Sequence, residues 1–172
     1  MAINYMAYRN KIYVAFDADS DIRYYRLMQA WTQNDHTSFN FNNAHDDNRI
    51  MPWSSEETIK ENLRQRFLDT KLFVLLVGER TKYLYKYVRW EIEQAIKRDI
   101  PIIVVNLNGL RNIDEQRCPL IIKEKLAIHV SFNQKIIELA MENWPLKSTN
   151  LKLQYFSGPY YYENSVYTSL NL

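Results

Sequence analysis

The chain has 172 residues, a length typical of one domain, and a net charge of +2. This near-neutral balance gives no electrostatic case for binding nucleic acid or an anionic membrane surface. A single cysteine, Cys118, excludes an intrachain disulfide, and the histidines are too far apart to suggest a structural zinc site. The three glycines lie far from one another, which excludes both the GxGxxG fingerprint and the P-loop.

Neither a membrane span nor a signal peptide is indicated. The longest apolar runs, residues 73–77 and 100–105, are far shorter than the roughly 20 residues that a transmembrane helix needs. The N-terminal residues lack a basic segment followed by an apolar one. We therefore expect a cytoplasmic protein with no membrane partner.

Short apolar runs alternate with amphipathic stretches along the whole chain. In chain order the pattern predicts a buried strand at 11–16, a helix at 20–32, an edge strand at 38–42, a helix at 54–68, a strand at 72–77, a helix at 85–98, strands at 102–105 and 126–130, and a last helix at 132–144. Continuous apolar runs of this length are typical of parallel strands covered on both faces. The alternation predicts an α/β fold, a parallel sheet with right-handed crossovers and helices on both faces.

The predicted organisation is one domain over residues 11–144, an N-terminal extension over 1–10 and a C-terminal extension over 145–172. Five of the 13 tyrosines lie in the C-terminal extension, which distinguishes its composition from that of the domain. We expect this segment to pack either on apolar surface of the domain or on a partner. At the start of the second helix, Ser54 and Glu57 have the spacing of a capping box.

Ligands of parallel sheets bind outside the carboxyl ends of the strands. After the first strand come Asp17, Asp19 and Asp21, which could hold magnesium and a phosphoryl group as in receiver domains. A receiver also needs an aspartate after its central strand, where this chain has Gly78, so we exclude phosphotransfer. An acidic loop would also repel the phosphate of FMN. The alternative to a ligand site is helix capping, with Asp19 or Ser20 as the N-cap.

The third predicted helix carries a glutamate at an informative position. On a helical wheel, Val88, Ile92 and Ala95 define the buried stripe, and Glu91 lies about 60° from Val88, at its border. Glu93 faces solvent. A partly buried carboxylate is a functional-site candidate, whereas a solvated or ion-paired side chain is the ordinary alternative.

Two further side chains are less informative. Trp53, just before the second helix, either stacks on a ligand base or forms a hydrophobic staple onto that helix. Cys118 has no candidate base near it in sequence, and we assign it no catalytic role.

Several strings, taken in order, resemble one family. They are Ala15-Phe16 before the acidic loop, Trp53 before the second helix, residues 73–78 leading into Thr81, and Tyr87-Val88-Arg89-Trp90-Glu91-Ile92. From about residue 11 to residue 144 the chain resembles the TIR-like proteins of the Thoeris anti-phage system, the ThsB family. The resemblance implies a flavodoxin-like TIR fold.

The resemblance also implies an activity. Family members are implicated in converting NAD⁺ to a cyclic ADP-ribose isomer on phage infection, and this signal activates a partner effector, ThsA. The family's catalytic glutamate corresponds to Glu91. NAD⁺ is then a substrate, with no cofactor and no metal required. The residues expected to contact it are Phe16, Asp17, Asp19, Trp53, Thr81, Tyr87 and Arg89.

The chain departs from the family pattern in two places. Tyr87 stands where a tryptophan is expected, and the acidic loop of Asp17 and Asp19 is unusual. A non-catalytic TIR-like interaction module and an NAD⁺ hydrolase giving linear ADP-ribose therefore stay open as alternatives. A phage component and a second copy of the chain are the further expected partners.

Overall fold

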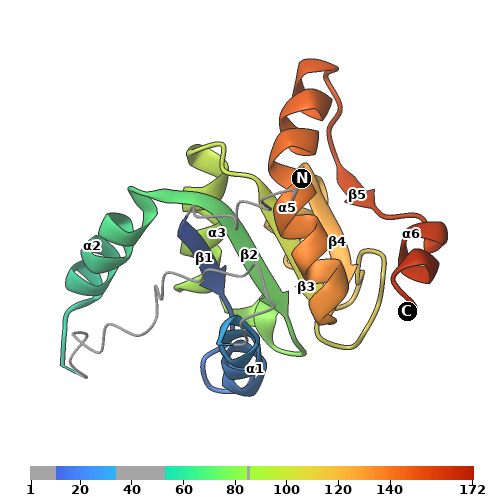
Figure 1. Ribbon diagram of the computed structural model, residues 1–172. Helices are drawn as coiled ribbons and strands as arrows, with labels where there is room; N and C mark the ends of the chain where they lie inside the picture. The colour runs from blue at the N-terminus through green and yellow to red at the C-terminus, as the bar shows by residue number, and fades with distance from the viewer. Residues whose placement is uncertain (1–10, 34–52, 85) are drawn as a thin grey trace.

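The computed structural model describes residues 11–33, 53–84 and 86–172 (Figure 1). In chain order the elements are β1 (Lys11–Ala15), α1 (Ile22–Thr32), α2 (Glu56–Phe67), β2 (Thr70–Val77), the 3-10 helix η1 (Thr81–Tyr83), α3 (Val88–Lys97), β3 (Ile102–Asn106), α4 (Leu120–Lys123), β4 (Ala127–Ser131), α5 (Gln134–Leu153), β5 (Pro159–Tyr161) and α6 (Asn164–Ser169). The edge strand expected at residues 38–42 lies outside the described residues.

The described strands form a five-stranded sheet in the order β1-β2-β3-β4-β5, and each pairs with its neighbours in parallel. Helices α1 and α5 lie on one face of this sheet, with α3 on the other (Figure 1). The predicted α/β fold, a parallel sheet with helices on both faces, is confirmed.

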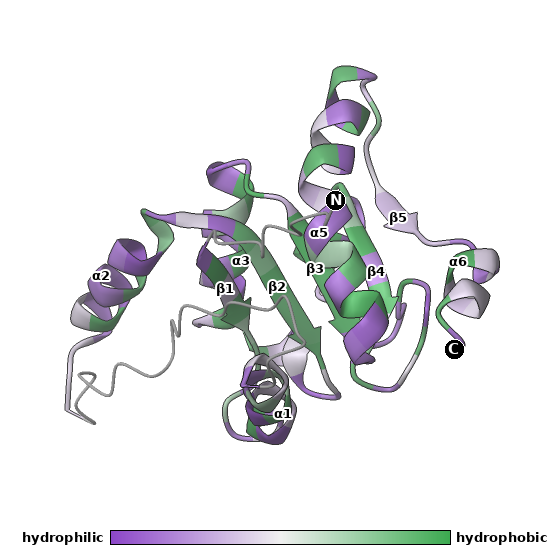
Figure 2. Cartoon of the chain, viewed as in Figure 1, coloured by the Kyte–Doolittle hydropathy of each residue, from purple (hydrophilic) through white to green (hydrophobic). Residues whose placement is uncertain are grey.

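Alternate residues of each strand face opposite sides of the sheet. Val14 and Val74 belong to one core cluster with Met28 of α1 and Trp144 of α5. Tyr13, one residue from Val14, belongs to a second cluster with residues of α2, α3 and α4. Because both faces are covered, the central strands are hydrophobic along almost their whole length (Figure 2).

Two helix N-termini lie slightly later than the sequence predicts. The N-cap of α2 is Ser55, not Ser54, and its side chain accepts a hydrogen bond from the Thr58 backbone N–H at 3.2 Å. The N-cap of α1 is Asp21, not Asp19 or Ser20, and its carboxylate makes no capping hydrogen bond. The carboxylate of Asp21 is therefore not committed to the helix that it precedes.

Helix α5 does not end at Trp144 as predicted but continues to Leu153 through Pro145. A proline inside a helix costs about 3 kcal/mol, since it removes one backbone donor and crowds the preceding turn. The turns after Pro145 bury Leu151, which favours continuation of the helix. The predicted boundary between residues 144 and 145 therefore falls within one continuous helix.

The tyrosine-rich segment packs on the domain. Strand β5 extends the sheet next to β4, and the ring of Tyr160 lies 5.4 Å from that of Trp144. Tyr167 of α6 is fully buried, and its hydroxyl accepts a hydrogen bond from the Ser131 backbone N–H at 3.3 Å. Of the two expected positions for this segment, the structure shows the one on apolar surface of the domain.

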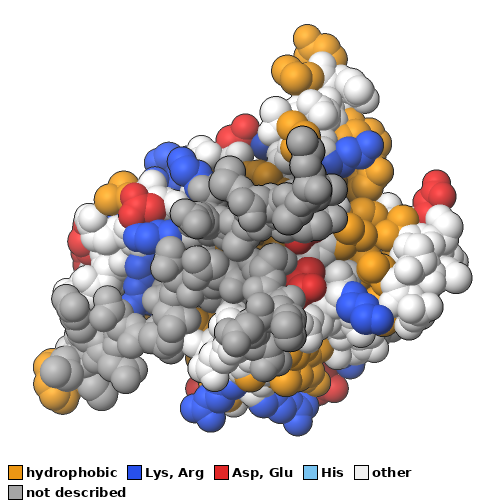
Figure 3. Space-filling view, in the orientation of Figure 1, with side chains coloured by type: hydrophobic (Ala, Val, Ile, Leu, Met, Phe, Trp, Pro, Cys, Tyr) orange, Lys and Arg blue, Asp and Glu red, His pale blue; other side chains and the backbone are white. Residues whose placement is uncertain are grey.

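The far end of α5 presents hydrophobic side chains to solvent, at the top of the space-filling view (Figure 3). Leu146 and Leu153 of α5 and Tyr155, two residues beyond the helix, are exposed. In the described ranges, no helix combines the length and the apolar character needed to cross a membrane.

Gly78, directly after β2, is required because another residue occupies the space of its missing side chain. A Cβ added there would lie 2.2 Å from Oδ2 of Asp21. We expect Gly78→Ala to lower the free energy of unfolding by about 2 kcal/mol, since overpacking forces the neighbour to move. Urea denaturation measures this. Adding Asp21→Ala to Gly78→Ala should recover most of the loss, and a single variant as stable as the wild type would contradict the argument.

Candidate functional site

Glu91 lies in the first turn of α3 and is buried, with only 4% of its surface exposed. Its Oε1 accepts a hydrogen bond from the hydroxyl of Tyr13 at 2.5 Å. Tyr13 comes from β1 and is itself fully buried. Of the two interpretations of Glu91, the solvated surface side chain is therefore wrong.

An aromatic cluster surrounds Tyr13. Its ring stacks on Phe67 of α2 with centroids 4.2 Å apart, and Phe67 in turn meets Trp90 edge-on at 6.2 Å. The carboxylate of Glu91 therefore lies beside this aromatic cluster and is shielded from water. Burial alone disfavours its charged form.

The surroundings of Glu91 shift its titration to neutral pH. Burial raises the pKa of the Glu91 carboxyl to about 7, while the Tyr13 hydrogen bond and the charge of Arg66 act in the opposite direction. Burial and the neighbouring Glu91 raise the pKa of Tyr13 well above its ordinary value, so it remains a hydrogen-bond donor. A carboxyl group that exchanges its proton near pH 7 is suited to catalysis.

The loop after β1 holds two of the expected substrate residues below the surface. Phe16 is buried in the core and stacks on Tyr25 with centroids 4.8 Å apart. Asp17 is buried too, and its Oδ1 accepts a hydrogen bond from the backbone N–H of Asp19 at 3.1 Å. Asp19 is exposed.

Trp53 is 79% exposed, so the hydrophobic staple predicted for it is wrong. A staple requires the indole to pack against the following helix, and an indole with this exposure does not. Its ring is accessible to a ligand.

Three expected residues lie near the start of α3. Thr81 accepts a hydrogen bond from the Gly78 backbone N–H at 2.8 Å, which closes the turn after β2. Tyr87 is the N-cap of α3 and half-buried. Arg89 is exposed and pairs with Glu93 at 3.1 Å. The prediction that Glu93 faces solvent is confirmed.

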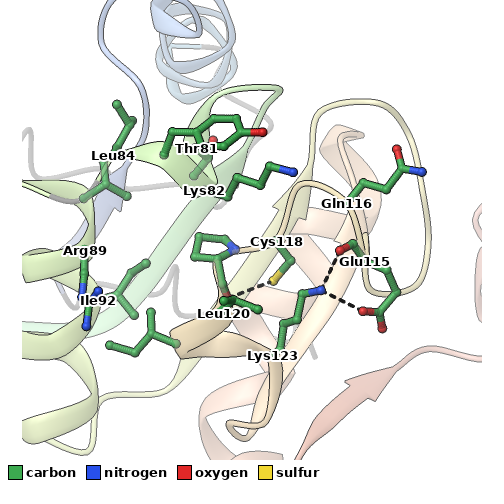
Figure 4. Close-up of a pocket in the computed structure, with 14 residues that line it drawn as sticks. Thr81, Lys82, Leu84, Arg89, Ile92, Glu115, Gln116, Cys118, Leu120 and Lys123 are labelled. Carbon is green, nitrogen blue, oxygen red and sulfur yellow. Dashed lines mark hydrogen bonds and ion pairs between the residues drawn. The ribbon is translucent and has the colours of Figure 1, made fainter.

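A cavity of about 590 Å³ lies between η1, α3 and α4 (Figure 4). Thr81 and Arg89 line it together with Cys118, but Glu91 does not. Burial raises the pKa of the Cys118 thiol to about 12, so it stays protonated at neutral pH. The structure thus brings Thr81 and Arg89 to one side of α3 and Glu91 to another.

Tyr13 is a residue of the site that the sequence patterns do not indicate. It lies within a continuous apolar strand, where tyrosine is expected as a core residue, and it meets a glutamate 78 positions later. No local pattern signals such a contact. Over the ranges that the structure describes, no group of three or more histidine, cysteine, aspartate or glutamate side chains is arranged to hold a metal ion.

We expect Tyr13→Phe to raise the pKa of Glu91 by about one pH unit, because the lost hydrogen bond stabilises the charged carboxylate. Carbon-detected NMR of the glutamate carboxyl groups follows this titration directly. Tyr25→Phe is the matched control, since Tyr25 is buried in the core cluster on the opposite face of the sheet. An unchanged Glu91 titration in Tyr13→Phe would show that the hydrogen bond does not tune it.

The parallel sheet and its covering helices define a flavodoxin-like α/β domain, with a buried glutamate in the first turn of α3. Comparison with protein families specifies which kind. The family described as Thoeris protein ThsB, TIR-like domain, matches residues 13–112, and the chain belongs to this family. The match includes Tyr13 and Glu91. Comparison with curated proteins finds no match.

Proposed function

We propose that this protein is an NAD⁺-consuming ADP-ribosyl cyclase of the cytoplasm, with Glu91 as its catalytic carboxylate. Its product, a cyclic ADP-ribose isomer, activates a ThsA-like effector during phage infection. The observation that carries the proposal is Glu91: it is buried, it titrates near neutral pH, and it lies within the string that resembles the family's catalytic segment. Membership of the Thoeris ThsB family supports it.

One carboxylate suffices for the first step. Nicotinamide leaves as a neutral molecule from a cationic linkage, so no acid has to protonate it. The glycosidic bond breaks through an oxocarbenium-like state, as in glycoside hydrolysis. The negative charge of Glu91 stabilises the positive charge that develops on the ribose, and the Tyr13 hydrogen bond orients the carboxylate.

Cyclisation follows when a nucleophile from the adenosine half of the same molecule bonds to the ribose carbon and loses a proton. Excluding water favours this outcome over hydrolysis. In the proposal, the exposed indole of Trp53 stacks on an aromatic part of NAD⁺ and Arg89 orients a phosphate. Phe16, Asp17, Asp19, Thr81 and Tyr87 complete the proposed set of substrate residues.

A non-catalytic interaction module is the second candidate function. It is favoured by the placement of Glu91, which does not line the cavity between η1, α3 and α4. Under this alternative, the Tyr13–Glu91 pair is a structural contact. A hydrolase would use the same carboxylate and admit water, releasing linear ADP-ribose.

Mass analysis of NAD⁺ products in lysates of phage-infected cells tests these alternatives. Cells express the wild type, Glu91→Gln, or Glu93→Gln as the matched control, because Glu93 lies exposed on the same helix. We expect a product of ADP-ribose minus water from the wild type and the control, and a loss of about 1,000-fold or more in Glu91→Gln. Linear ADP-ribose alone would support the hydrolase. No product from the folded wild type would support the interaction module.

A further inference from the structure

A second cavity, of about 280 Å³, lies where the segments following β1, β2 and β3 meet. It is lined by the start of α1, by Gly78 to Arg80 after β2, by Leu107 and Asn108 after β3, and by Arg117. This edge of a parallel sheet is where α/β proteins bind ligands. Glu91 does not line this cavity, so binding of a ligand here does not require the proposed catalytic carboxylate.

Asp21 lines this cavity, and its carboxylate makes no capping hydrogen bond to α1. Asp21 is only 6% exposed, and within the described part of the chain its Oδ2 has no hydrogen-bond partner. Its oxygens lie close against Gly78, which leaves them room only because that residue has no side chain. Burial, and next the charge of Asp17, raise the pKa of Asp21. A buried acceptor without a donor is unfavourable, and a ligand hydroxyl would satisfy it.

The cavity is lined by three guanidinium groups, those of Arg23, Arg80 and Arg117, and by two carboxylates, those of Asp21 and Glu79. The cations outnumber the carboxylates, so the lining favours an anion although the loop after β1 is acidic. The contacts of the arginines with side chains are long: Arg80 Nε lies 3.9 Å from Asp17, and an Arg117 nitrogen lies 3.4 Å from Glu79. Each guanidinium has five N–H donors, so most remain available to a ligand. Arginine forks match the oxygens of phosphate.

We propose that this cavity binds a small phosphorylated sugar. The arginines hold the phosphate, and Asp21 accepts a hydrogen bond from a hydroxyl group of the sugar. The combination of a buried acceptor with several cationic donors is complementary to a molecule that carries both groups. The volume of about 280 Å³ fits one sugar phosphate and is too small for a dinucleotide.

Titration with ribose 5-phosphate, monitored by backbone amide NMR and by calorimetry, tests the proposal. Inorganic phosphate and ribose, each of which carries one part of this molecule, are titrated separately for comparison. We expect ribose 5-phosphate to bind at least about tenfold more tightly than phosphate, and to shift the amide signals of Gly78 and Leu107. Arg23→Gln and Arg117→Gln should each weaken binding about tenfold. Arg26→Gln is the matched control, since Arg26 lies exposed on the same helix and outside the cavity.

Asp21→Asn distinguishes the contact with the sugar from the contacts with the phosphate. It should weaken the binding of ribose 5-phosphate about tenfold and leave the binding of inorganic phosphate unchanged. Glu91→Gln should bind like the wild type, whatever its effect on NAD⁺. The proposal is overturned if ribose 5-phosphate does not bind at about 10 mM, if it binds no better than phosphate, or if Arg26→Gln weakens it as much as Arg23→Gln does.

Discussion

At pH 8 we expect Glu91→Gln to be more stable than the wild type by about 2 kcal/mol, although it removes a proposed catalytic residue. The pKa of the Glu91 carboxyl is about 7 in the folded protein, against an ordinary value of 4.5. Above both values, this difference corresponds to about 3 kcal/mol of stability lost to a buried charge. Glutamine carries no charge, but its amide leaves donors unpaired in the same space, which reduces the gain.

Whether the wild type gains or loses stability as the pH rises depends on which state, folded or unfolded, keeps the proton of Glu91. Between pH 4.5 and about 7, the folded protein holds the proton of Glu91 and the unfolded chain has released it. The wild type therefore loses stability as the pH rises through this window, and below it the carboxyl is neutral in both states. The advantage of Glu91→Gln should reach its full size above pH 7. Below pH 4.5 only the cost of the unpaired amide remains, and the variant should be about 1 kcal/mol less stable than the wild type.

Urea denaturation at several pH values measures this difference. Glu93→Gln should stay within about 0.5 kcal/mol of the wild type throughout, because Glu93 is exposed. If Glu91→Gln were less stable than the wild type at pH 8, the glutamate would be a structural residue. This result would support the non-catalytic interaction module over the cyclase.

A chain that ends at Trp144 is expected not to fold. The truncation removes the last part of α5, β5 and α6, and with them the buried side chains of Leu151 and Tyr167. It also uncovers Trp144, which packs against Tyr160. Burying each of these large side chains contributes about 2–3 kcal/mol, and their sum is comparable with the whole stability of a domain.

Near-UV circular dichroism and amide NMR of the truncated chain test this expectation. Two full-length variants measure the contribution of Tyr167 to the stability of the domain separately from the truncation. Tyr167→Ala should cost about 3–5 kcal/mol, the range for a large buried aromatic. Tyr167→Phe, which loses only the hydrogen bond to the Ser131 backbone at 3.3 Å, should cost about 1 kcal/mol. A folded chain ending at Trp144 would show that residues 145–172 are a separate extension.

Strands β1 to β4 could be predicted from the amino-acid order alone, because a strand buried on both faces must be apolar at almost every position. The half-buried strand β5 lacks this pattern and is not predicted. A run such as Leu72 to Val77 has no other explanation at that length. Helical periodicity likewise separated Glu91 from Glu93, since it fixes which side of a helix a residue occupies. Family membership followed from short strings that the chain carries locally.

The contacts that make up the two sites depend on tertiary structure, because they join residues far apart in the chain. The hydroxyl of Tyr13 on β1 meets Glu91 on α3, and the carboxylate of Asp21 lies against Gly78. Helix α5 continues through Pro145 because packing of the later turns outweighs a local preference to stop. Local patterns encode which residues are buried, but which buried groups meet is set by how strands and helices assemble.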